Sequence, residues 1–265
     1  MIAWKWRLPT KDGFVPLWWR WGFILLLGAL ASTAVLIELD VLRLLQSGGS
    51  LWQFLGQLLT VPDWAYIPKL LLKMLETIEM GVVSTAIALL LSLPLGVLAA
   101  RNTSPHPVLY HCIRNLLNLM RALPELVWAL VFVSAVGLGP LPGVMALIFV
   151  TTGFLGKFLA ESIEVVDANG VIGVKSTGAG WLQTLMFAVF PLALPDFIGT
   201  VLYILDHNVR SATILGLVGA GGIGYELVMS MRLFNYGRLI LIATAIYIVV
   251  TILDRFSDVL RSRVI

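Results

Sequence analysis

Long uncharged stretches alternate with short polar segments along this chain. The first two cover residues 21–37 and 80–100, and a third covers residues 126–156. Because a helix needs roughly 20 apolar residues to cross about 30 Å of hydrocarbon, the third stretch is too long for one span. Glycines and prolines interrupt it at residues 137–143, where we expect a turn between two helices. The pattern therefore predicts a series of membrane-spanning helices.

The remaining boundaries bring the expected number of spans to about six. The third would begin near Ile113, the fourth would end near Glu161, the fifth would cover about residues 192–217 and the sixth about residues 236–253. An even number of spans places both termini on one side of the membrane. If that side is the cytoplasm, the inside segments hold twelve Lys and Arg residues and the outside segments five. This excess predicts an N-in, C-in topology.

The composition indicates an all-α membrane protein. Hydrophobic residues make up 59% of the 265 residues and charged residues only 12%, whereas about a quarter of a soluble domain is charged. Only helices and closed barrels satisfy the backbone inside a bilayer, and long continuous apolar runs favour helices over the alternating strands of a barrel. The single cysteine, Cys112, excludes an intrachain disulfide.

Two regions are expected along the chain. Residues 1–69 would hold the first span and short interfacial helices on the outer face, because residues 41–75 combine glycines and prolines with tryptophan and tyrosine. Residues 70–265 would form a core of the other spans, with its longest inside loop at about residues 165–191. A loop of that length usually has a function of its own.

The inside loop has a short helix-compatible stretch, Val171 to Ser176, followed by Gly178 and by Pro191 thirteen positions after the glycine. Glycine permits a sharp bend after a helix, and proline can start the next helix without losing a needed donor. By itself this spacing is equally compatible with an ordinary helix–turn–helix connection.

Polar residues gather inside the expected fifth span at Asp206, His207, Asn208, Arg210 and Ser211. Ionisable groups within a membrane are costly and mark functional sites. Asp206 and Arg210 are four residues apart and share a helix face, so they could neutralise each other. Alternatively, the cluster lines an anion path in which Arg210 offers forked donors. For His207 we expect a packing or outer-mouth role.

Glu125 follows Pro124 inside the expected third span. Proline breaks the helical hydrogen-bond ladder, and a polar group beside such a break often faces a cavity. This makes Glu125 a candidate for the same path, and a pair with Arg121 is the alternative.

Motifs for catalysis or metal binding are missing from the sequence. It contains no G-x-x-x-x-G-K-[ST] phosphate loop, no H-E-x-x-H and no G-x-S-x-G motif, and its three histidines lack metal-ligand spacing. Gly219–Gly224 superficially matches a dinucleotide fingerprint, but no strand precedes it, so we expect a close-packed outer loop. We therefore expect a chain that is not an enzyme and holds no metal or cofactor of its own.

Four stretches, in order, resemble the phosphonate branch of the permeases of ATP-binding-cassette (ABC) importers: Leu93–Asn102, Arg121–Pro140, Gly156–Glu164 and Asn208–Gly224. The resemblance covers about residues 70–262. It implies import of phosphonate, phosphite or a related phosphorus oxyanion across a bacterial plasma (inner) membrane.

The resemblance also implies partners. These are an extracytoplasmic substrate-binding protein, two ABC ATPase subunits that carry ATP and Mg, and a second copy of this chain in contact with membrane lipid, with no role for nucleic acid. The inside loop is then similar to a coupling helix that sits in a groove of the ATPase. The matching positions are Val171, Ile172, Gly173, Val174, Lys175, Gly178, Ala179 and Pro191, although Ile172 and Gly173 stand where the family usually has Glu and Ala.

Two function classes compete with this interpretation. A sister ABC permease for an amino acid or a metal chelate would share the same fold. An ion-coupled secondary transporter usually shows inverted repeats with broken helices at matching positions, and Pro124 has no counterpart in the second half of the chain. A membrane enzyme would need the catalytic motifs that are missing.

Overall fold

A computed structural model describes residues 17–36, 41–58 and 61–264 of the chain. Within these residues the chain is helical and has no strand, which confirms the all-α fold class. Its contacts divide it into two compact units, Met1–Gly56 and Gln57–Ile265, which are described separately.

The first unit contains helix α1 (Leu17–Leu36) and most of helix α2 (Val41–Leu58). Helix α1 falls where the first span is expected, and residue 37 lies outside the described residues. Polar side chains recur along α2 among leucines, as in a helix that lies at a membrane surface. The interfacial position of α2 stays a prediction.

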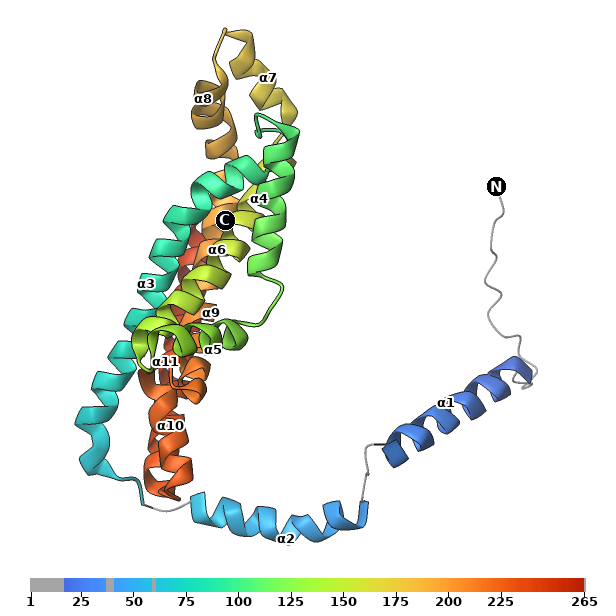
Figure 1. Cartoon of the computed structure of the whole chain (residues 1–265), viewed down its shortest axis with the longest axis vertical. Helices are drawn as coiled ribbons and strands as arrows, with labels where there is room; N and C mark the ends of the chain where they lie inside the picture. The colour runs from blue at the N-terminus through green and yellow to red at the C-terminus, as the bar shows by residue number, and fades with distance from the viewer. Residues whose placement is uncertain (1–16, 37–40, 59–60, 265) are drawn as a thin grey trace. The chain divides into compact units, whose positions relative to one another are not determined.

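The second unit is built around long helices that run side by side (Figure 1). Helix α3 (Ile67–Ala99) packs against α6 (Pro140–Val165) and α9 (Phe190–Leu215), and α11 (Tyr236–Val264) packs against α9. Four helical segments of the described chain are long and apolar enough to cross a membrane, namely 64–99, 140–165, 181–218 and 236–260.

The start of helix α3 differs from the prediction of short interfacial helices within residues 41–75. A single turn of 3-10 helix, η1 (Trp64–Tyr66), leads directly into it, so residues 67–75 belong to a long membrane helix and not to separate interfacial helices. Pro68 lies in the first turn of α3, where proline costs no hydrogen bond and starts the helix.

The expected third span is not one helix. Helix α4 (Pro107–Met120) and helix α5 (Glu125–Val136) meet at a break with a bend of 86°. Pro124 causes the break because it has no backbone N–H and disfavours helical geometry in the residue before it. Counting this pair as one broken span raises the number of candidate spans in the described chain to five.

The fifth helical span begins earlier than residue 192, where the sequence pattern predicts its start. The helical path already starts at α8 (Trp181–Thr184) and passes through a π-helical segment, η2 (Leu185–Val189), before α9. Pro191 lies in the first turn of α9 and cannot donate, and the wide turn ends just before it, where the Phe190 N–H bonds to the Leu185 carbonyl. A π turn of this kind often marks a functional position in a helix.

The glycine-rich segment after α9 is close-packed, as expected, but it is not only a loop. A short turn, η3 (Gly216–Val218), leads to helix α10 (Gly222–Arg232), which runs beside α11 and the first part of α3 (Figure 1). A side chain on Gly224 would place its Cβ 1.8 Å from the carbonyl oxygen of Thr213. Only glycine allows α9 and α10 to approach this closely.

Candidate functional site

Asn208 joins three of the long helices through hydrogen bonds. Its Nδ2 donates to the Thr85 hydroxyl of α3 over 2.8 Å, and its Oδ1 accepts from the Thr151 hydroxyl of α6 over 2.9 Å. The side chain is buried, with 2% of its surface exposed. Because an unpaired polar group is expensive in an apolar interior, this bridge fixes the relative register of α3, α6 and α9.

Ser211 lies about one helical turn further along α9 and contacts Glu125 of α5. The Ser211 hydroxyl donates to Oε1 of Glu125 over 2.8 Å and lies 3.3 Å from Nε2 of His207. Glu125 is the first residue of α5, so the break at Pro124 presents its carboxylate to α9. A carboxylate at a helix N-terminus is also favoured by the helix dipole.

The alternative pairing of Glu125 with Arg121 is not present. The Arg121 guanidinium instead lies 4.4 Å from the centre of the Phe154 ring, in a cation–π contact. The Glu125 carboxylate therefore forms its hydrogen bond with Ser211 and not with Arg121.

These residues surround a small cavity between α5, α6 and α9. The polar part of its lining consists of Glu125, Thr151, His207, Asn208 and Ser211, and the apolar part of Leu147, Val150, Phe154 and Ile204. The lining contains hydroxyl, amide, imidazole and carboxylate groups but no Lys or Arg. The site can therefore exchange hydrogen bonds with a polar molecule without offering it a cationic side chain.

Arg210 points away from this cavity. One nitrogen, Nη2, donates to Asp206 Oδ2 over 3.0 Å and to Asp254 Oδ1 of α11 over 2.9 Å. The pair with Asp206 that the four-residue spacing predicts is present, and Asp254 adds a second carboxylate. The five expected path residues thus separate into Glu125, Asn208 and Ser211 around the cavity and Asp206 and Arg210 toward α11.

Sequence reasoning missed Thr85, Thr151 and Asp254, and it gave His207 a role apart from the cavity. A threonine in a membrane helix often donates to the carbonyl four residues earlier, as Thr85 also does to Gly81, so its sequence position alone does not indicate a shared site. Asp254 lies just after the expected end of the last span, where a charged residue is typical of the polar segment that flanks a membrane helix.

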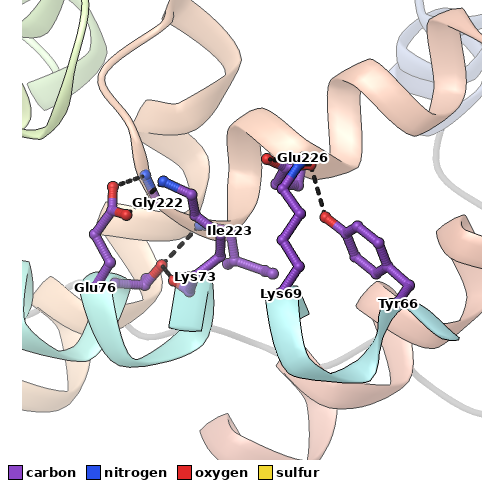
Figure 2. Close-up of polar contacts among 8 residues, drawn as sticks. Tyr66, Lys69, Lys73, Glu76, Gly222, Ile223 and Glu226 are labelled. Atoms are coloured by element: carbon purple, nitrogen blue, oxygen red, sulfur yellow. Dashed lines mark hydrogen bonds and ion pairs between the residues drawn. The ribbon is translucent and has the colours of Figure 1, made fainter. Parts of the chain in front are cut away.

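A second polar cluster ties the start of α3 to α10 (Figure 2). Glu226 accepts from the Tyr66 hydroxyl over 2.6 Å and from Lys69 Nζ over 3.0 Å. Glu76 accepts from the Gly222 N–H over 3.0 Å, at the start of α10. Burial raises the pKa of Glu226, but the hydrogen bonds from Tyr66 and Lys69 outweigh it and lower the pKa. Glu226 is therefore held in its ionised form.

The expected coupling residues lie on and after helix α7 (Ala168–Ser176), at the end of the second unit opposite α10 (Figure 1). The carboxylate of Asp167 caps the helix by accepting from the Asn169 N–H over 3.0 Å. No residue of α7 is buried, and Ile172 is 62% exposed. Val171, Ile172, Gly173, Val174 and Lys175 all belong to this helix.

Gly178 and the residues after it turn the chain back toward α9. Gly178 has φ +84°, a left-handed conformation that other residues adopt at a cost, and its N–H bonds to the Lys175 carbonyl over 3.0 Å. Ala179 follows in the turn, and Pro191 lies on α9. The Trp181 indole N–H then donates to the Thr103 carbonyl over 2.9 Å, which attaches α8 to the turn after α3.

Glu164 is held within the chain itself. Its Oε1 accepts from Arg114 Nη1 over 2.7 Å and from the Arg101 N–H over 2.9 Å. These bonds join the end of α6 to α4 and to the turn after α3. They therefore fix the end of the helix that precedes α7.

This combination of long helices, a broken helix pair and an exposed helical loop defines an ABC importer permease. The model of the family "Binding-protein-dependent transport system inner membrane component" matches residues 92–265, and the chain belongs to this family. It is therefore the inner-membrane permease component of a binding-protein-dependent importer, as its sequence resemblance indicates.

Curated relatives narrow the similarity further. The chain is 41% identical over 223 residues to the phosphite transport system permease protein PtxC of Stutzerimonas stutzeri, an alignment that covers 84% of this chain and 81% of that protein. It is 46% identical over 190 residues to the phosphate-import permease protein PhnE of Mycolicibacterium smegmatis, covering 72% of this chain but only 36% of that protein.

Solved structures share the fold at low sequence identity. A chain of the MetNI methionine ABC transporter in an inward-facing conformation aligns with a TM-score of 0.67 at 20% identity, over 77% of this chain and 99% of that one. A chain of an amino acid ABC transporter crystallised with histidines aligns with a TM-score of 0.65 at 15% identity, over 77% and 100%. At these identities the likeness concerns the fold alone.

Proposed function

We propose that this permease imports phosphonate, phosphite or a related phosphorus oxyanion. The observation that carries the proposal is the 41% identity to a phosphite permease over most of both chains. A sister permease for another small solute is the alternative. Its support is weaker, since the betaine permease ProW of Escherichia coli is 27% identical over 68% of this chain.

We further propose a homodimer of six-span subunits with N-in, C-in topology, served by two ATPase subunits and an extracytoplasmic binding protein. The distribution of basic residues supports the topology. The absence of a phosphate-loop motif supports a separate ATPase. In this arrangement ATP binding and hydrolysis switch the subunits between outward-open and inward-open states.

Helix α7 is the proposed contact with the ATPase. Every residue of α7 is accessible, its N-terminus is capped, and Gly178 lets the chain reverse directly after it. A short, rigid and exposed helix can transmit a rigid-body movement. Val171, Ile172, Gly173, Val174, Lys175, Gly178, Ala179 and Pro191 are the proposed coupling residues.

The proposed substrate path passes the cavity between α5, α6 and α9. Asn208, Ser211 and Glu125 would contact the passing oxyanion directly. Asp206 and Arg210 would border the path from the α11 side. Buried polar residues with a cavity among apolar helices support this assignment.

The proposal is tested by uptake of labelled phosphite in cells that express this chain with its ATPase and binding protein. We expect ATP-dependent uptake that requires this chain and that unlabelled phosphite or methylphosphonate competes away. Competition by sulfate would be weak. If neither phosphite nor a labelled phosphonate enters while the complex assembles, the substrate assignment is wrong and the sister permease becomes the better interpretation.

A further inference from the structure

We propose that Glu125 selects the protonated form of the oxyanion, so that the permease passes a species carrying one P–OH group and a single negative charge. This inference rests on the proposed function and identifies a specificity-determining residue within it. It starts from the charges around the cavity.

A carboxylate and an oxyanion repel each other unless a proton lies between them. Glu125 lines the cavity, with one oxygen, Oε1, held by the Ser211 hydroxyl over 2.8 Å. A P–OH group can donate to the remaining oxygen of Glu125 in a short charge-assisted hydrogen bond, whereas a fully ionised oxyanion has no hydrogen to donate. The carboxylate thus favours the protonated form and disfavours the dianion.

No cationic side chain offsets this preference within the cavity lining. Arg210 is engaged by two carboxylates, Asp206 and Asp254, and these three groups together carry one surplus negative charge. Arg121 lies over Phe154, 4.4 Å from the ring centre, with its charge directed at the aromatic face. A dianion would therefore enter a region of the membrane that is already negative.

Further polar groups line the cavity with Glu125, and the hydroxyl hydrogens of Ser211 and Thr151 among them are already donated to Glu125 and Asn208. From α9 these groups include Ser211 and His207, whose Nε2 lies 3.3 Å from the Ser211 hydroxyl, and from α6 the neutral Thr151. Arg121, just before α5, is the nearest cation in sequence. A lining without Lys or Arg holds an anion loosely, which suits a path that the substrate must leave again.

The class of substrate follows from this chemistry. Phosphite and alkylphosphonates carry one hydroxyl as monoanions and lose it with the second proton as the pH rises, whereas phosphate keeps a hydroxyl even as a dianion. Sulfate has already lost both protons. The cavity would thus add a second selection, after the binding protein, for tetrahedral oxyanions that still carry a proton.

The test is the pH profile of transport at saturating loaded binding protein, in proteoliposomes with the complete complex. The wild type and Glu125→Gln are each measured with phosphite and with methylphosphonate, which holds its second proton to higher pH. Glu79→Gln, an exposed glutamate of α3, is the matched control. For wild type and control we expect transport to fall as the second proton leaves, at a higher pH for methylphosphonate than for phosphite.

In Glu125→Gln we expect the alkaline fall to flatten for both substrates, with transport at pH 8.5 at least threefold higher, relative to pH 6, than in the wild type. An unchanged profile in this variant overturns the inference. If Glu125→Gln does not assemble with the ATPase, the pH profile of Glu125→Asp is measured in its place. This variant keeps the carboxylate, so the midpoint of its alkaline fall must still differ between phosphite and methylphosphonate. A common midpoint for both substrates in the wild type also refutes it, whereas no transport of either substrate at any pH refutes the proposed function instead.

Discussion

At the scale of single residues, the site depends on side chains that the sequence could only partly indicate. Glu125, Asn208 and Ser211 stand out because each is polar within an apolar run, and the structure places them around one cavity. The bond between Asn208 and Thr151 joins residues that are 57 positions apart, and no local pattern encodes such a pairing. The direction of Arg210 likewise depends on Asp254, which is 44 positions away.

Glu226 provides a pH prediction at this scale. Its folded-state pKa is lowered, so its contribution to stability is present above the unfolded pKa, about 4.3, and is lost as the pH falls through the folded value. We expect Glu226→Gln to reduce stability at pH 7 by about 1.5–3 kcal/mol, the range for hydrogen bonds to a charged group. It should also reduce the difference in melting temperature between pH 7 and pH 4.

The measurement is thermal unfolding of the purified complex in detergent at both pH values. Glu161→Gln serves as a comparison, because the Glu161 carboxylate makes only a 3.6 Å ion pair with Lys157 on its own helix. An equal acid dependence in Glu226→Gln and the wild type would show that the α3–α10 cluster does not carry this effect.

At the scale of elements, apolar runs predicted most membrane helices but not their breaks and joints. Pro124 was identified as a helix breaker, yet the 86° angle between α4 and α5 follows from packing of α5 on α6 and α9, which involves residues far along the chain. The glycines at residues 219–224 predict a loop, although α10 begins among them at Gly222. The short helix before Gly178 was expected from the residues and is present as α7.

Gly178 carries the prediction for this scale. Its φ of +84° is inaccessible to proline, which fixes φ near −65°, and costs about 1–2 kcal/mol for alanine. We expect Gly178→Pro to abolish ATP hydrolysis stimulated by the loaded binding protein, and Gly178→Ala to reduce it partly. Gly180→Ala is the control, because Gly180 has φ −69° and its added Cβ would come no closer than 3.7 Å to a neighbour.

Hydrolysis by the reconstituted complex is measured with and without loaded binding protein. Full stimulation in Gly178→Pro would exclude a coupling role for the turn after α7. Loss of stimulation in Gly180→Ala would show that the loop tolerates no change, so that Gly178 is not special.

At the scale of the whole molecule, the family and the membrane setting could be inferred from sequence, because four separated stretches and the hydropathy pattern agree. The number of spans could not be inferred from sequence, because four or five candidate spans lie in the described chain and α1 belongs to the other compact unit. The cavity could be predicted only in part for the same reason, because its lining comes from α5, α6 and α9, which the fold brings together.

Topology gives the prediction for the whole molecule. Twelve basic residues in the expected inside segments against five outside predict a cytoplasmic C-terminus. We expect green fluorescent protein fused after Ile265 to fluoresce and alkaline phosphatase at the same position to be inactive. The opposite pair of results would reverse the orientation and place α7 on the wrong face for an ATPase.

The π-helical segment Leu185–Val189 has a consequence for engineering this family. A wide turn accommodates roughly one extra residue, which rotates everything after it by about 100° relative to an uninterrupted α-helix. A helical wheel drawn from Trp181 would therefore place Asn208 and Arg210 each about 100° away from the face on which it lies. Cysteine scans and grafts between relatives should count their register from Pro191 onward, because a homologue that lacks the wide turn would carry the same letters on a different side.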